Sequence, residues 1–151
     1  MQGISSLGAR GSIKRITRIK ANNMNNEDAL KIVKKYKKVI EDILHIDSLP
    51  IIWRITTYTK FFAWTSFPND ESKYFIIRIC PSKCKTERDV IDTMYHEGLH
   101  ILLHMLYPHL NEETLDASHD IEELCVRVLE GVFHDSNGHN LIKRLAKGKT
   151  K

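Results

Sequence analysis

The sequence predicts one small α+β domain, and three observations lead to this prediction. The chain has 151 residues, about the number that a single hydrophobic core serves. Its 42% of hydrophobic and 28% of charged residues are typical of a globular protein and exclude a disordered or low-complexity chain. Strand-like patterns stand apart from helix-like ones, in the order helix, three strands, helix, helix, which favours an α+β fold.

The first predicted helix covers residues 27–46. Asn25 or Asn26 can cap its N-terminus, and Ser48-Leu49-Pro50 ends it. Apolar residues recur at helical spacing and are expected to form its buried stripe: Leu30, Val33, Val39, Ile40, Ile43 and Leu44.

Three strand-like runs follow, at Ile51–Tyr58, Phe61–Phe67 and Lys73–Cys80, each rich in β-branched and aromatic residues. Their connections are short, so we expect a mostly antiparallel, meander-like sheet. Four aromatic residues in these runs are expected in the core or on a sheet face, in preference to stacking on nucleic-acid bases: Trp53, Trp64, Phe61 and Phe62.

Two further helices complete the predicted domain. Thr86 and Asp89 form a capping start for a helix that runs to Leu106, just before Pro108. The last predicted helix covers about residues 118–133. Its apolar stripe is expected to be buried: Ile121, Leu124, Cys125, Val128, Leu129 and Val132.

Charge is unevenly distributed along the chain. Residues 24–142 hold 13 basic and 19 acidic residues, whereas residues 1–23 and 143–151 each hold five basic residues and no acidic one. We therefore expect one folded domain over 24–142, a disordered basic N-terminal extension and a basic C-terminal tail. Such tails can make weak contacts with nucleic acid by counterion release; the alternative is that they are solvated termini without a partner.

The sequence favours a cytoplasmic protein with no membrane association. No apolar run approaches the roughly 20 residues that cross a bilayer, and the N-terminus lacks the apolar segment of a secretory signal. Cys80 and Cys84 stand in a C-x3-C arrangement that could give two thiolates to a structural zinc ion. Because there is no second such pair, reduced thiols are the favoured interpretation. Nothing in the sequence specifies an oligomeric state.

The motif His96-Glu97-Gly98-Leu99-His100 lies inside the second predicted helix. Residues four apart leave a helix from nearly the same face, so both imidazoles can reach one divalent ion about 2.0–2.1 Å away. Glu97 lies about 100° around the axis from His96, beside such an ion, where it can act as a general base. His104 continues the row but lies about 12 Å along the axis from His96, too far to share the ion.

A third ligand has to come from outside the motif. On a helical wheel of the last predicted helix, Glu122 lies at the edge of the apolar stripe, where a carboxylate needs a partner such as a metal ion. We expect Glu122 as the third ligand, with His119 as the alternative. The wheel gathers three charged residues on the side expected to face solvent: Glu123, Arg127 and Glu130.

With these segments the chain resembles the zincin metallopeptidases, in particular the gluzincin type and the short H-E-x-x-H proteins of phages and prophages. The resemblance covers about residues 51–134 and is carried by the segments Tyr95–Leu103 and Ile121–Leu129, the second with its Glu-Glu pair. It implies a minimal zincin fold, a Zn²⁺ ion held by His96, His100 and Glu122, and Glu97 as the base.

The resemblance also implies an extended peptide or protein substrate that lies along an edge strand, for which Lys73–Cys80 is the expected segment. Candidates for stabilising the oxyanion are Tyr107, His109, His134 and His139, and candidates for orienting the imidazoles are Asp92, Asp116 and Asp120. The expected function is that of a small zinc-dependent peptidase, a hydrolase. The alternative is a non-catalytic, metal-stabilised binding or regulatory module, phage-associated or bound to nucleic acid through its basic tails.

Overall fold

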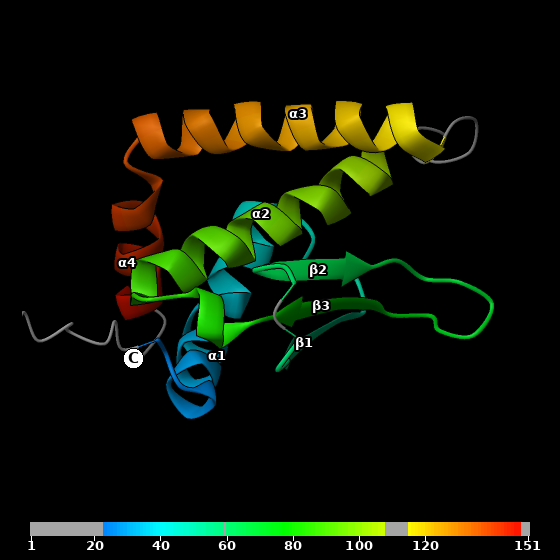
Figure 1. The fold of residues 1–151 in the computed structure, drawn as a ribbon. Helices are drawn as coiled ribbons and strands as arrows, with labels where there is room; N and C mark the ends of the chain where they lie inside the picture. The colour runs from blue at the N-terminus through cyan, green and yellow to red at the C-terminus, as the bar shows by residue number, and fades with distance from the viewer. Residues whose placement is uncertain (1–22, 59, 108–114, 149–151) are drawn as a thin grey trace, which may run out of the picture.

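The computed structural model describes residues 23–58, 60–107 and 115–148, with the backbone alone for 115–119. It confirms the predicted α+β class (Figure 1). The described helices are Asn26–Ile43 (α1), Glu87–Leu106 (α2), Leu115–Asp135 (α3) and Gly138–Gly148 (α4), with a short 3-10 turn at Pro81–Lys83. The strands are Ile51–Ile55 (β1), Ala63–Ser66 (β2) and Phe75–Ile79 (β3). Several calls from the sequence lie outside the described residues: the extension before residue 23, residues 149–151, and the side chains of His109, Asp116 and His119.

The sheet is mixed, so the expected antiparallel meander is wrong for one of its two strand pairs. Its strand order is β1-β3-β2, with β3 parallel to β1 and antiparallel to β2. The physical reason is burial. β3 carries three buried residues, Phe75, Ile77 and Ile79, and is therefore best placed in the centre, between β1 and β2.

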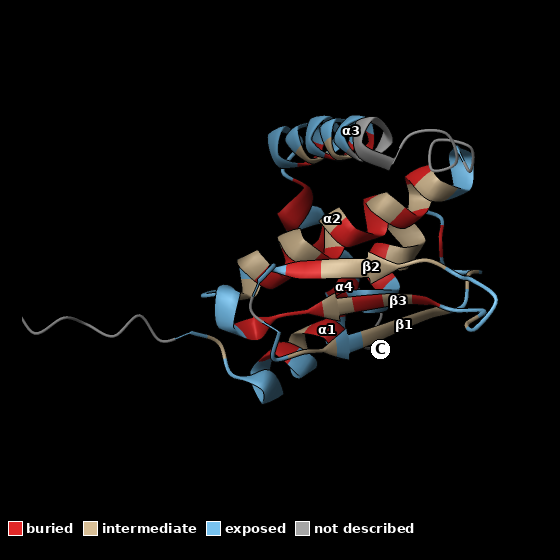
Figure 2. Cartoon of the chain, turned by 45° about the vertical axis from the view of Figure 1, so that its right-hand side comes forward, coloured by how far each residue is buried: buried red, intermediate tan, exposed pale blue. Residues whose placement is uncertain are grey.

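The core lies between the sheet and the helices α1 and α2 (Figure 2). Ile77 and Ile79 of β3 pack there with Ile91 and Met94 of α2, all fully buried. Gly98 of the H-E-x-x-H motif lies where α1 ends against α2: a Cβ at this position would stand 2.5 Å from Leu44 Cδ1. The small residue therefore lets α1 pack closely against α2.

The helix caps follow the sequence. Thr86 and Asp89 form a complete capping box at the start of α2, with bonds of 3.1 Å from Asp89 N to Thr86 Oγ1 and 2.9 Å from Thr86 N to Asp89 Oδ2. Asn25 caps α1 by accepting a hydrogen bond from Asp28 N. α1 ends at Ile43, before the predicted residue 46, because the chain turns at His45 with a positive φ of 55°.

α3 lies on the side of α2 that faces away from the sheet (Figures 1 and 2). Its apolar stripe is exposed. This corrects the prediction that the stripe is buried: Leu124 is 62% exposed, and the other stripe residues are also exposed. Toward α2 the helix presents Glu122, Val126 and Phe133, which are buried. Polar contacts to α2 and a few apolar ones therefore set its orientation.

α4 is an element that the sequence analysis did not predict. It continues to Gly148, so the folded part of the chain extends beyond residue 142, where the basic tail was expected to follow. Ile142 and Ala146 are buried, and the helix packs against α1 and α3. The segment between α3 and α4 has a turn-like sequence, and a helix start was therefore not predicted there. Among the described residues, no helix has both the length and the apolar character needed to cross a membrane.

Candidate metal centre

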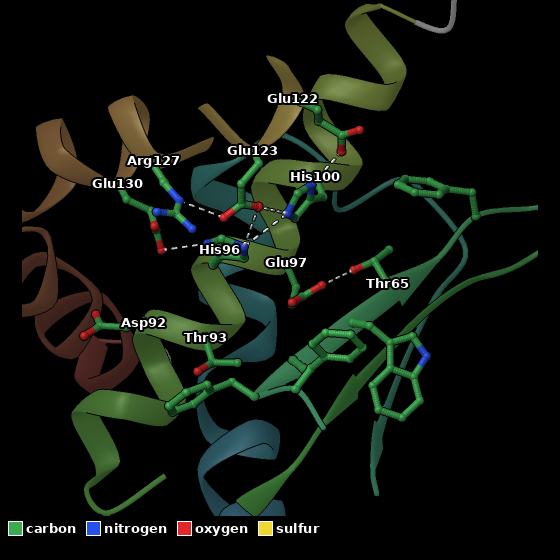
Figure 3. A pocket seen from close by; sticks show the side chains of 15 residues that line it. Thr65, Asp92, Thr93, His96, Glu97, His100, Glu122, Glu123, Arg127 and Glu130 are labelled. Atoms are coloured by element: carbon green, nitrogen blue, oxygen red, sulfur yellow. Dashed lines mark hydrogen bonds and ion pairs between the residues drawn. The ribbon is translucent and has the colours of Figure 1, made fainter. Parts of the chain in front are cut away.

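Three elements bring polar side chains together in one cavity (Figure 3). α2 contributes His96, Glu97 and His100, and β2 contributes Thr65. α3 contributes Glu122, Glu123 and Glu130. α2 can supply these groups because it lies between the sheet and α3: one side of the helix packs into the core, and the imidazoles leave from another. The cavity has a volume of about 730 Å³, a size ordinary for a ligand site.

The Nε2 atoms of the two motif histidines face each other and share a third neighbour. His96 Nε2 and His100 Nε2 are 3.1 Å apart, and Glu123 Oε2 lies 3.7 Å from the first and 3.5 Å from the second. Donor atoms around a tetrahedral zinc ion with bonds of about 2.0–2.1 Å lie about 3.3–3.4 Å apart. The spacing of these three atoms therefore fits one such ion.

The other nitrogen of each imidazole faces a carboxylate. His100 Nδ1 is 2.5 Å from Glu122 Oε1, and His96 Nδ1 is 3.1 Å from Glu130 Oε1. A carboxylate acceptor favours the proton on Nδ1, which leaves the Nε2 lone pairs directed at each other and at the Glu123 carboxylate. Such a convergence of electron pairs is unfavourable unless a cation lies between them.

The charges around this cluster shift the pKa values of its members. Burial lowers the pKa of His96, but its hydrogen bond to Glu130 and the nearby carboxylates outweigh burial, and the net pKa is raised. Burial would raise the pKa of Glu123, yet it is lowered on balance by Arg127, which donates from Nε to Glu123 Oε1 at 2.9 Å, and by the two imidazoles. Arg127 thereby holds one carboxylate oxygen and leaves Oε2 directed at the histidines.

Glu97 lies beside this cluster and is only 5% exposed. Thr65 Oγ1 donates a hydrogen bond of 2.7 Å to Glu97 Oε2, which fixes the carboxylate against β2. Burial raises the pKa of Glu97, while Thr65 and the two imidazoles act in the opposite direction. A carboxyl group with a raised pKa beside a metal-ligand cluster is suited to take up and release a proton.

The structure brings Glu123, and not the expected Glu122, to the two Nε2 atoms. Glu122 instead contacts the outer nitrogen of His100. The helical wheel grouped Glu123 and Glu130 correctly but assigned their side of α3 to solvent, because it assumed that the apolar stripe faces the core. One sequence pattern could have indicated that this side of α3 faces the site: Glu123, Arg127 and Glu130 are spaced i, i+4 and i+7 and so share one helix face.

Among the described residues, the other candidate site residues predicted from the sequence lie outside the cluster of His96, His100 and Glu123. His104 stacks on the Phe67 ring, with centroids 4.3 Å apart, and does not belong to the cluster. Tyr107 is exposed at the end of α2. Asp120 is exposed as well. Three residues lie together in a second cluster: Asp92, His134 and His139.

The strand next to the site also differs from the expectation. Lys73–Cys80 contains β3, which is the central strand, so the edge strand beside the cavity is β2. Phe61 and Phe62 precede β2, are half exposed and line the cavity, in contrast to the core or sheet-face position expected for them. Trp53 packs against the core and donates from Nε1 to Glu41 Oε1 at 2.7 Å.

The cysteines do not take part in a metal cluster among the described residues. Cys80 and Cys84 are free and buried, and burial raises the pKa of the Cys84 thiol to about 11. Cys125 is free and exposed on the outer side of α3. That the thiols are reduced stays a prediction from the sequence.

The chain was compared with protein-family models, with curated proteins and with solved structures, and none of them matches it.

Proposed function

We propose that this protein is a zinc-dependent peptidase whose metal ligands are His96, His100 and Glu123. The observation that carries the proposal is the convergence of two imidazole Nε2 atoms and one carboxylate oxygen, 3.1–3.7 Å apart, beside a buried carboxylate in a cavity. Two histidines and one glutamate are the protein ligands of several catalytic zinc sites, which keep a further position open.

The zinc ion would supply Lewis-acid activation of water and of the scissile carbonyl group. Glu97 would take a proton from the attacking water on one carboxylate oxygen and return it to the leaving amine. Thr65 holds Oε2 of Glu97 and thereby fixes the direction of the carboxylate. Glu122 and Glu130 hold the imidazoles in the tautomer that presents Nε2 to the ion.

The substrate would be an extended peptide. β2 pairs with β3 along one edge only, and in the described part of the chain no strand occupies its other edge, next to the cavity. A peptide can add to such an edge through main-chain hydrogen bonds. Phe61, Phe62 and Phe67 line the same cavity and favour an apolar side chain in the substrate.

The test compares Glu97→Gln with the wild type on a mixed peptide library, with zinc content measured on the same samples. We expect an unchanged zinc content and a loss of hydrolysis of about 10²–10⁴-fold, because the amide cannot accept the proton. Glu71→Gln, an exposed glutamate in the β2–β3 loop, is the matched control and should cleave like the wild type.

Two results would contradict the proposal. Full activity of Glu97→Gln would exclude this carboxylate as the base. A zinc-loaded wild type that cleaves no peptide, yet melts at a higher temperature with zinc than without it, would identify a non-catalytic metal-stabilised module instead.

A further inference from the structure

A second cluster of metal-binding side chains lies where α2, α3 and α4 meet. It consists of Asp92 from α2, His134 near the end of α3 and His139 at the start of α4. Asp92 precedes His96 by four residues, and His134 follows Glu130 by four, so this cluster lies about one helical turn from the first along both α2 and α3. The proposed peptidase chemistry uses none of the three residues.

The donor atoms of the cluster converge on His139 Nε2. Asp92 Oδ1 lies 2.7 Å from it and His134 Nδ1 lies 3.3 Å from it. Arg88 Nε also donates a hydrogen bond to this nitrogen, at 3.2 Å. A neutral imidazole nitrogen has either one lone pair or one proton, so it can satisfy only one of these neighbours.

Asp92 Oδ1 is buried and makes no hydrogen bond despite its short distance from the imidazole. The ring N–H direction of His139 therefore does not point at this oxygen, and an ordinary His–Asp hydrogen bond does not account for the contact. A buried carboxylate oxygen without a hydrogen bond is costly unless a cation satisfies it. A metal ion accepts the lone pairs of all three donors at once.

His139 is the most deeply buried of the three residues of the second cluster. Its side chain is packed against the ring of Phe133, and the residue is only 8% exposed. Burial, followed by the charges of Arg88, His134 and Lys143, lowers the pKa of His139 to about 4.

The backbone between α3 and α4 is shaped to bring the two histidines together. Asn137 has a positive φ of 60°, which reverses the chain. Gly138 follows, and a Cβ at this position would stand 2.1 Å from the Phe133 ring, so a larger residue would displace that ring. The turn places the His134 and His139 rings with centroids 5.2 Å apart.

Arg88 competes with a metal ion for the Nε2 atom of His139, because its Nε donates a hydrogen bond to that atom. Besides its bond to His139, its Nε lies 3.8 Å from Asp92 Oδ2. Its side chain is 63% exposed, so it can release His139 at little cost and remain beside Oδ2. Oδ1 is the Asp92 oxygen that lies next to His139.

We propose that Asp92, His134 and His139 bind a second divalent transition-metal ion, and zinc is the ion used to test it. Two imidazoles and one carboxylate suit zinc, and other ions of this series bind the same donors. Such an ion would join the turn between α3 and α4 to α2. Among the described side chains of α3, the buried apolar ones are Val126 and Phe133. The inference does not depend on the proposed peptidase activity.

The test is zinc stoichiometry, measured on the full chain after removal of metal with a chelator, addition of ZnCl₂ and removal of excess. We expect two zinc ions per chain in the wild type and one in His134→Ala. The side chain of His134 is exposed, so its removal should leave the fold intact. Asp92→Asn should also bind one. Asp135→Ala, the neighbouring exposed residue outside the cluster, is the control and should bind two.

The two sites are separated by His96→Ala, which removes a ligand of the first site only. This variant should retain one zinc ion, and the double variant with His134→Ala should retain none. A wild type with one ion that is lost in His96→Ala but kept in His134→Ala would overturn the second site and leave the first intact. One ion lost in His134→Ala but kept in His96→Ala would uphold the second site and contradict the first.

Discussion

At the scale of single residues, the outer nitrogens of the two motif histidines determine what their inner nitrogens can bind. Glu122 and Glu130 each face an Nδ1 atom, so neither has to touch an ion to affect its binding. The pair formed by His100 and Glu122 is the more deeply buried, with side chains 15% and 10% exposed. A charge-assisted hydrogen bond is stronger where water is excluded.

We therefore predict that Glu122→Gln lowers zinc affinity by about 10–100-fold, because the amide orients His100 less strongly and lowers its basicity. Glu123→Gln should lower the affinity further, since it removes a ligand. Competition with a chromophoric chelator measures both. If Glu123→Gln bound zinc like the wild type while Glu122→Gln did not, the roles assigned to the two glutamates would be reversed.

At the scale of elements, the sequence predicted the arrangement of site residues within one helix, but not how the residues of two helices meet. The geometry of His96, Glu97 and His100 follows from the period of α2 alone and could be predicted. The choice between Glu122 and Glu123 depends on how α3 is rotated against α2, which no pattern within α3 determines. The apolar stripe suggested one rotation, and the contacts of Glu122, Glu123 and Glu130 to the imidazoles favour the other.

The rotation of α3 can be tested by stability. Leu124→Ala on the exposed side should change the free energy of unfolding by less than about 0.5 kcal/mol. Val126→Ala on the buried side should cost about 2 kcal/mol, because it removes two buried methyl groups and leaves a cavity. Urea unfolding at a fixed zinc concentration measures both values. Equal losses in the two variants would mean that the outer face of α3 is buried in the protein.

At the scale of the whole molecule, the site lies between two parts of the fold. The sheet, α1 and α2 contribute most of the apolar core, and α2 holds the histidines. α3 adds Val126 and Phe133 to that core and supplies the carboxylates from its polar side. The grouping of strands apart from helices made the α+β class predictable. The parallel pairing of β1 with β3 and the existence of α4 were not, because both depend on burial that the separate segments do not reveal.

Anomalous scattering at the zinc absorption edge, from crystals of the zinc-loaded protein, tests most directly whether His96, His100 and Glu123 hold one zinc ion. We expect a peak about 2.0–2.2 Å from His96 Nε2, from His100 Nε2 and from a carboxylate oxygen of Glu123. Glu122 should remain on His100 Nδ1. The absence of a peak between the two imidazoles, or a peak ligated by Glu122 with Glu123 turned to solvent, would contradict this assignment.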